Sequence, residues 1–183
     1  MKTTMAGWTL ALAAGLCSTG AWAALAVGEP APDFTVQAAL AGKTFDFSMK
    51  DALKKGPVVL YFYPAAFTQG CTVEAHTFAE AIVDYDALGA TVIGLSADDI
   101  ETLKDFSTGP CGSKFAVGAD TGSRVIKAYD AGLGVHTERA TRMSYVISPE
   151  GRILYEYTAM EPDDHVANTL KAVRDWRAQQ TGK

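Results

Sequence analysis

Residues 58–74 read VVLYFYPAAFTQGCTVE, and this segment joins a buried strand to a helix. The run 58–63 is apolar with almost no alternation, which predicts a strand covered on both faces. Pro64 then ends the strand, because proline has no backbone N–H to donate. The apolar residues that follow have helical spacing: Phe78, Ile82, Tyr85 and Leu88. Cys71 therefore falls at the junction between the strand and the N-terminus of the helix.

That junction favours a reactive cysteine. The first backbone N–H groups of a helix have no partner within the helix, and the helix dipole is positive there. Both features stabilise a thiolate, which is the nucleophilic form of a cysteine. Cys71 is thus the first candidate for a catalytic residue.

The rest of the chain predicts a mixed β-sheet flanked by helices. Strands at 58–63 and 91–96 with a helix between them imply parallel pairing, and a late hairpin at 144–157 implies an antiparallel part. The other expected elements are a first hairpin around 41–43, a helical turn at 50–53, a helix that Asp98 or Asp99 caps, a short strand at 115–119, a helix at 123–129 and a terminal helix at 163–180. The fold class expected is α/β, in one domain covering 24–183.

Residues 1–23 have the pattern of a secretory signal peptide. Lys2 is their only charge, an apolar stretch follows it, and Ala21-Trp22-Ala23 matches a small-residue cleavage site. We expect cleavage after Ala23, removal of Cys17 with the signal, and a periplasmic or secreted protein. Two cysteines, Cys71 and Cys111, would remain.

Composition excludes several classes of function. The formal net charge is −5 and no basic patch is visible, so a nucleic-acid partner is not expected. Beyond residues 1–23 no apolar stretch reaches the ~18 residues that a membrane span needs. The potential metal ligands Cys71, His76, Cys111 and His136 lack zinc-site spacing, and there is no Cys-x-x-Cys motif of the thioredoxin kind. Neither a metal nor an organic cofactor is expected.

The pattern Pro64-x-x-x-Thr68-x-x-Cys71 after such a strand resembles the active-site signature of the peroxiredoxins, the cysteine-based peroxidases of the AhpC/TSA superfamily. The chain is similar to the peroxiredoxin Q, or bacterioferritin-comigratory-protein, class of that family. The resemblance implies a thioredoxin-like fold and reduction of hydrogen peroxide and organic hydroperoxides through a sulfenic acid on Cys71.

The resemblance also assigns roles to residues around Cys71. Thr68, backbone N–H groups and an arginine would stabilise the thiolate and the developing charge on the peroxide oxygens. Arg142 directly precedes an expected strand and matches the family's arginine, while Arg139 is an alternative farther from that strand. Glu74 would help to hold the arginine. Each residue also has an ordinary structural interpretation: a surface ion pair for Arg142, a helix N-cap for Thr68, a strand end for Pro64, and a favourable acid in the first helical turn for Glu74.

The resemblance offers two positions for a cysteine that resolves the sulfenic acid on Cys71. In one branch of the class the resolving cysteine lies five residues after the peroxidatic one, but here that position is His76. Five residues correspond to about 140° around a helix, so we interpret His76 as an ordinary, partly exposed histidine. Another branch carries the resolving cysteine in the next helix, and Cys111, 40 residues after Cys71, fits it. The glycines and proline at 109–112 would let this segment unfold locally.

Two functions remain open at this point. The first is a peroxidase with a peroxide substrate, an intramolecular Cys71–Cys111 disulfide as intermediate and a thioredoxin-like dithiol protein as reductant, acting as a monomer or weak dimer. The second is a secreted thioredoxin-fold binding or structural module with a permanent Cys71–Cys111 disulfide, since two cysteines in an oxidising compartment commonly pair. Thiol titration before and after one equivalent of peroxide separates them.

Overall fold

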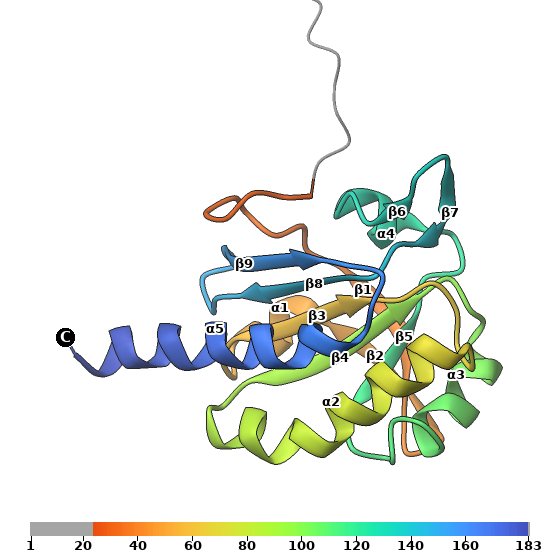
Figure 1. Cartoon of the computed structure of the whole chain (residues 1–183), viewed down its shortest axis with the longest axis horizontal. Coiled ribbons are helices and arrows are strands. Elements are labelled where there is room, and N and C mark those ends of the chain that lie inside the picture. Colours follow the sequence, from red (N-terminus) through yellow and green to blue (C-terminus); the bar gives the residue numbers. More distant parts are fainter. Residues whose placement is uncertain (1–23, 183) are drawn as a thin grey trace, which may run out of the picture.

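The computed structural model describes residues 24–182, which form a sheet with helices on both faces (Figure 1). The expected signal peptide lies outside the described residues. The elements are β1 (Thr35–Leu40), β2 (Lys43–Ser48), α1 (Met49–Leu53), β3 (Val58–Phe62), α2 (Gln69–Ala87), β4 (Thr91–Ser96), α3 (Ile100–Thr108), β5 (Ala116–Ala119), α4 (Arg124–Ala128), β6 (Gly132–Leu133), β7 (His136–Ala140), β8 (Met143–Ile147), β9 (Ile153–Thr158) and α5 (Asp163–Thr181).

Seven strands form the main sheet in the order β2-β1-β5-β4-β3-β8-β9. β3 pairs in parallel with β4, and β4 with β5, as the strand–helix–strand pattern predicted. β8 pairs antiparallel with both β3 and β9, so the late hairpin extends the sheet on the other side of β3. The mixed α/β sheet expected from the sequence is therefore confirmed.

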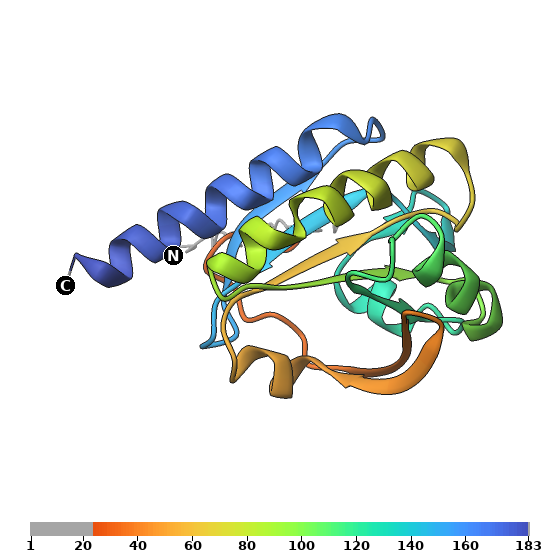
Figure 2. The ribbon, with the colours of Figure 1, turned by 90° about the horizontal axis from the view of Figure 1, so that it is seen from below.

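The two faces of the sheet carry separate hydrophobic clusters. Helices α2 and α5 run side by side on one face, and α1 lies on the opposite face (Figure 2). Alternate residues of β3 feed the two clusters: Val59 and Tyr61 pack on the α2 side, and Leu60 and Phe62 on the α1 side. All are fully buried, which explains why this strand shows no polar alternation. The central strand is thereby fixed on both faces, and its end is a rigid base for the loop that follows.

Several local signals specify where the helices begin. The side chain of Asp99 accepts a hydrogen bond from the backbone N–H of Thr102, so Asp99, and not Asp98, caps α3. Ser48 caps α1 in the same way through Asp51 N–H. Asp98 instead accepts hydrogen bonds from Ala66 N–H, at 2.6 Å, and from the Ser96 hydroxyl. It thus ties the loop after β3 to the end of β4.

The small antiparallel pair β6–β7 was not expected. Its longer strand, His136–Ala140, is mostly exposed and shows no alternation of apolar and polar residues, so the sequence carries no strand signal there.

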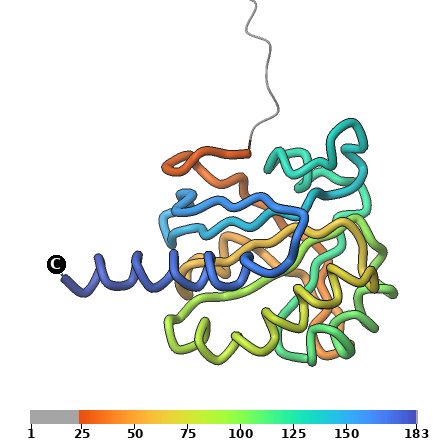
Figure 3. Tube along the Cα trace, viewed as in Figure 1, coloured from red at the N-terminus to blue at the C-terminus, as the bar shows by residue number. Residues whose placement is uncertain are grey.

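The chain before β1 runs beside β9 (Figure 3). Gly28 N–H donates to the carbonyl of Ile153, and Ile153 N–H donates to that of Glu29. The entry segment is therefore fastened to the edge of the sheet.

Candidate active site

Cys71 lies in the first turn of α2, directly above the end of β3. Thr68 is the N-cap residue of this helix, and Thr72 N–H makes a backbone hydrogen bond to the Thr68 carbonyl. The N–H groups of residues 69–71 precede that bond, so they are among those that lack a partner in the helix. The Cys71 side chain is 1% exposed and belongs to the cluster on the α2 side of the sheet. A sulfur atom is thus held at the positive end of a 19-residue helix.

Arg142 provides the positive charge beside that sulfur. Its Nη2 lies 3.5 Å from Cys71 Sγ, its Nη1 donates to Glu74 Oε2, and its Nε donates to the Met160 carbonyl at 2.8 Å. The side chain is only 4% exposed. Burial by itself would lower the pKa of Arg142, but Glu74 and Cys71 raise the pKa above its ordinary value, so the guanidinium stays charged. Arg139, the alternative considered from the sequence, is exposed on β7.

Gly70 lets the arginine reach the sulfur. A Cβ atom at this position would lie 2.9 Å from Arg142 Nη2 and 3.8 Å from Arg142 Cζ. The guanidinium cannot move away freely, because hydrogen bonds to Glu74 and Met160 hold it. The absence of a side chain immediately before Cys71 is therefore a requirement of this site.

Gly70→Ala is accordingly expected to slow oxidation of Cys71 by about 10- to 100-fold, because small misplacements of a charge-stabilising group have effects of that order. Thermal stability should fall, because the new Cβ would displace the buried guanidinium from its hydrogen bonds to Glu74 and Met160, and this cost exceeds the small gain in helix propensity. Stopped-flow oxidation and thermal unfolding measure the two effects. Gly122→Ala is the matched control, since its Cβ would meet only Arg124 Cγ at 3.8 Å. An unchanged rate for Gly70→Ala would show that Arg142 need not occupy this position.

Glu74 is a buried partner of the arginine and not merely an acid at a helix start. Its side chain is completely buried, and Oε2 accepts the bond from Arg142. Burial raises the pKa of Glu74 to about 8, although Arg142 opposes the shift. Oε1 of the same carboxyl has no hydrogen-bond partner. The carboxyl therefore has one oxygen committed to Arg142 and one oxygen free.

His165 is a buried residue near this carboxyl that the sequence did not point to. It lies in the first turn of α5 on the stripe that packs against the sheet, where a histidine cannot be distinguished by spacing from a core residue. Its Nδ1 is 2.8 Å from Ser144 Oγ and 3.7 Å from Glu74 Oε1, and its Nε2 is 2.9 Å from the Ala159 carbonyl. Burial and, to a lesser extent, Arg142 lower the pKa of His165.

Thr68 and Pro64 flank the nucleophile without contacting its sulfur in this state. The Thr68 hydroxyl donates to the Ala65 carbonyl at 3.1 Å, and no side-chain bond caps the helix. Pro64 is half-buried two residues after the end of β3. Between them Phe67 adopts a left-handed backbone conformation with φ of 62° and is 54% exposed. Its ring packs edge-on against Phe106 of α3, with centroids 5.2 Å apart.

Cys111 lies just after α3 and not within it. Its side chain is fully buried, and burial raises the pKa of its thiol well above the ordinary value. The adjacent Gly112 approaches Ala79 of α2, since a Cβ on that glycine would lie 3.9 Å from the Ala79 Cβ. Ala79 is eight residues, or about 12 Å along the helix, beyond Cys71. Both cysteines are free thiols, and forming a disulfide would require Cys111 to move toward the helix start.

Two tyrosines, one on β3 and one directly after it, lie on the buried face next to the thiols. Tyr61 and Tyr63 are fully buried, and burial raises the pKa of both hydroxyls well above the ordinary value. Neither hydroxyl has a hydrogen-bond partner of ordinary geometry. Ser96 lies near the Tyr63 hydroxyl and partly offsets the effect of burial on its pKa. Both hydroxyls therefore remain neutral.

His76 has a side chain that is 68% exposed and faces Glu80, as the ordinary interpretation of this residue predicted.

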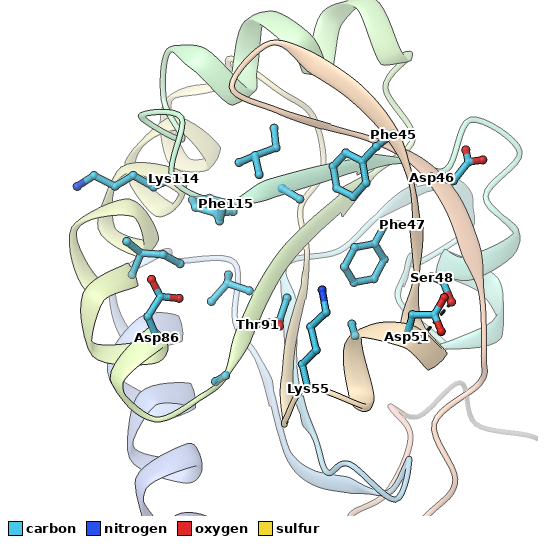
Figure 4. Close-up of a pocket in the computed structure, with 16 residues that line it drawn as sticks. Phe45, Asp46, Phe47, Ser48, Asp51, Lys55, Asp86, Thr91, Lys114 and Phe115 are labelled. Carbon is cyan, nitrogen blue, oxygen red and sulfur yellow. Dashed lines mark hydrogen bonds between the residues drawn. The ribbon is translucent and has the colours of Figure 1, made fainter.

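A groove on the surface of the described residues lies away from this site. It has a volume of about 440 Å³ and is bounded by β2, α1 and the C-terminal half of α2 (Figure 4). Exposed Phe45 and half-exposed Leu40 line it, whereas Cys71, Glu74 and Arg142 do not. Within residues 24–182, no group of three histidine, cysteine or acidic side chains could hold a metal ion, and none of the helices there is both long and apolar enough to cross a membrane.

Comparison with known proteins places these features in a family. Residues 27–156 match the model of the AhpC/TSA family. Peroxiredoxin Q from the chloroplast of Triticum aestivum is 34% identical over 149 residues, which are 81% of this chain and 66% of that protein. Peroxiredoxin Bcp of Bacillus subtilis (strain 168) is 30% identical over 154 residues, which are 81% of this chain and 95% of that protein. The chain thus spans just under two thirds of the wheat relative and almost the full bacterial relative.

Solved structures show the same fold. The crystal structure of peroxidoxin BcpB from Mycobacterium tuberculosis superposes with a TM-score of 0.74 at 24% identity, covering 81% of this chain and 96% of that one. Peroxiredoxin Q of Xanthomonas campestris gives a TM-score of 0.68 at 22% identity, covering 78% and 91%. At these identities the likeness concerns the fold, which is the thioredoxin-like sheet expected from the sequence.

Proposed function

The chain belongs to the AhpC/TSA family and is a peroxiredoxin of the Q/Bcp type, and from that premise we propose that it is a thiol peroxidase with Cys71 as the peroxidatic residue. The observation that carries the proposal is the contact of 3.5 Å between Cys71 Sγ and Arg142 Nη2 at the N-terminus of α2. A helix terminus and a buried guanidinium both favour a thiolate at this position. The substrates are hydrogen peroxide and organic hydroperoxides.

In the first step the thiolate attacks one peroxide oxygen and the O–O bond breaks. The sulfur becomes a sulfenic acid, and the other oxygen leaves with a proton as water or an alcohol. Arg142 and the free N–H groups at the start of α2 stabilise the negative charge that develops on the oxygens. Thr68 would join them once its hydroxyl turns from the Ala65 carbonyl toward the peroxide. No metal or organic cofactor enters this step.

In the second step Cys111 attacks the sulfenic sulfur of Cys71, forming a disulfide and releasing water. The segment 109–114 must first leave the hydrophobic cluster. Two consecutive residues in it, Gly112 and Ser113, have positive φ values of 56° and 59°. For serine this conformation is strained, and the strain is released when the segment opens. A thioredoxin-like dithiol protein then reduces the disulfide.

Cys111→Ser tests this division of roles. The variant is expected to react once with peroxide at the unchanged rate and then to accumulate a sulfenic acid on Cys71, because no second thiol can displace water. Trapping with a 1,3-dione reagent followed by mass spectrometry detects the product. Turnover with a dithiol reductant protein should fall at least about tenfold. Undiminished turnover would mean that the protein is a one-cysteine peroxidase, in which an external thiol resolves the sulfenic acid on Cys71.

Thiol counting separates the peroxidase from a module with a permanent disulfide. It is done in a Cys17→Ser background so that only Cys71 and Cys111 report. The peroxidase shows two free thiols and loses both rapidly with one equivalent of peroxide, whereas the module shows none until it is strongly reduced. The two free thiols of the structure favour the peroxidase.

Location and assembly complete the proposal. Residues 1–23 would export the chain to the periplasm or the medium, with cleavage after Ala23. Its reductant would then be a dithiol protein of that compartment. The proposed assembly state is a monomer or weak dimer.

A further inference from the structure

A line of buried polar groups continues behind Arg142 and ends at His165. Arg142 contacts Cys71 on one side and Glu74 Oε2 on the other. The second oxygen of the carboxyl, Oε1, has no hydrogen-bond partner and lies 3.7 Å from His165 Nδ1. The side chains of Glu74 and His165 are both completely buried. An unpartnered oxygen and an imidazole nitrogen therefore face one another inside the protein.

The hydrogen bonds of His165 determine which ring nitrogen carries the proton. The Ala159 carbonyl can only accept, so Nε2 must donate the bond of 2.9 Å. The lowered pKa of His165 keeps the ring neutral near neutral pH, which leaves Nδ1 without a proton. Ser144 Oγ, at 2.8 Å, donates to Nδ1. Nδ1 is therefore a basic atom facing the free oxygen of the carboxyl.

The state of the carboxyl complements this arrangement. Its pKa is raised to about 8 by burial, so near neutral pH the carboxyl readily holds a proton. Since Arg142 occupies Oε2, that proton belongs on Oε1, the oxygen that faces His165. A small rotation of the carboxyl would turn the 3.7 Å separation into a hydrogen bond when the Ser144 hydroxyl turns away and leaves the single lone pair of Nδ1 to the carboxyl proton.

We propose that His165 is a positioning residue that shares one proton with Glu74 and thereby determines how much of the Arg142 charge acts on the Cys71 thiolate. With the proton present, the Glu74–His165 pair is neutral and the guanidinium charge is directed to the sulfur. Without it, the pair is negative and competes with the sulfur for the same guanidinium. The inference rests on the proposed role of Cys71 as the reacting thiolate.

Other titratable groups lie around the Glu74–His165 pair, but none of them takes the place of either residue in sharing the proton. Tyr61 on β3 stays neutral because burial raises its pKa. The ring of Tyr157 on β9 packs edge-on against His165, with centroids 4.8 Å apart. Asp164, next to His165 on α5, has a small effect on the pKa of the imidazole that opposes the larger effect of burial. The titratable or charged groups that face the pair are thus Cys71, Arg142, Tyr61, Tyr157 and Asp164.

The test is a pH titration of the Cys71 thiolate by its ultraviolet absorbance, without peroxide. Cys17 and Cys111 are replaced by serine in the full chain, so that Cys71 is the only thiol. Because peroxide is absent, the result does not depend on peroxidase activity, and the two proposals fail separately. Lack of any reaction with peroxide counts against the proposed function, and an unchanged titration counts against the role of His165.

Three variants have different expected directions. His165→Gln keeps a donor for the Ala159 carbonyl but has no atom that binds a proton, so the thiolate midpoint should rise by about one pH unit. Glu74→Gln removes the competing negative charge and should lower the midpoint. Ser144→Ala frees the Nδ1 lone pair for the carboxyl and should also lower it. Ser144→Ala also keeps the proposal testable if His165→Gln does not fold.

The decisive comparison is the double variant Glu74→Gln/His165→Gln. If His165 acts through the shared proton, adding His165→Gln to Glu74→Gln shifts the midpoint no further. A shift of the same size in both backgrounds would mean that His165 only supports packing and would overturn the proposal. An unchanged midpoint in both His165→Gln and Ser144→Ala would do the same. His76→Gln is the matched control, since this exposed histidine on α2 should leave the titration unchanged.

Discussion

Cys71→Ser is expected to reduce peroxide consumption to the uncatalysed background, the largest effect of any single substitution in this chain. A serine hydroxyl at the same position is not ionised near neutral pH, and only the ionised sulfur is nucleophilic enough to attack the O–O bond. The fold should persist, because serine is nearly isosteric with cysteine and remains at a helix N-terminus. Consumption of hydrogen peroxide in the presence of a dithiol reductant measures the effect.

The control for this variant is the Cys111→Ser protein, which retains one complete oxidation. Circular dichroism and thermal unfolding confirm that both variants are folded. Rapid peroxide turnover by folded Cys71→Ser would mean that another residue is the nucleophile, and the assignment of the site around α2 would be wrong.

Arg142→Ala is expected to slow the oxidation of Cys71 by about 10²–10³, the size typical for loss of one preorganised charge-stabilising donor. The substitution also removes the group that opposes protonation of the buried Glu74, so the pKa of this carboxyl rises further, and the protein loses a buried hydrogen bond and some stability. Arg142→Lys should restore only part of the rate, because an ammonium group cannot contact Cys71, Glu74 and Met160 together in the planar geometry of the guanidinium.

Arg139→Ala is the matched control for Arg142. Arg139 lies three residues earlier in the chain and is exposed on β7, so its loss should leave the rate unchanged. Stopped-flow oxidation of the single-thiol protein gives the rate constant for each variant. A change of less than about threefold for Arg142→Ala, or a comparable loss for Arg139→Ala, would remove Arg142 from the mechanism.

The strand–helix junction at Cys71 could be predicted from the sequence because it depends on local patterns. Continuous apolar character marked β3, helical spacing marked α2, and the residues of both elements lie within one short segment. The caps of α1 and α3 are equally local signals. By contrast, only two residues of β7, His136 and Ala140, pair with β6. The strand is mostly exposed, so no apolar pattern identifies it.

The buried polar neighbours of the thiol could not be predicted in the same way. Glu74 was equally consistent with an exposed acid in the first turn, and its burial results from packing against segments 68 and 91 residues away. His165 occupies a position on the buried stripe of α5, where spacing alone indicates a core residue. Its partner Ser144 is 21 residues distant on β8, and only the packing of α5 against that strand brings the two together. Long-range electrostatics depends on contacts that no local pattern encodes.

The burial of Cys111 has a consequence for how the protein would behave at high oxidant load. Under the resolving role proposed for this residue, a newly formed sulfenic acid waits until segment 109–114 opens. That waiting time does not depend on the peroxide concentration. The rate of a second oxidation, which converts the sulfenic acid to a sulfinic acid that thiols do not reverse, rises in proportion to the peroxide concentration. Above a certain peroxide concentration the second oxidation is faster than disulfide formation with Cys111, and the protein is inactivated. The packing of the fully buried Cys111 side chain in the hydrophobic cluster, which opposes the opening, would therefore set the dose of peroxide that the protein survives.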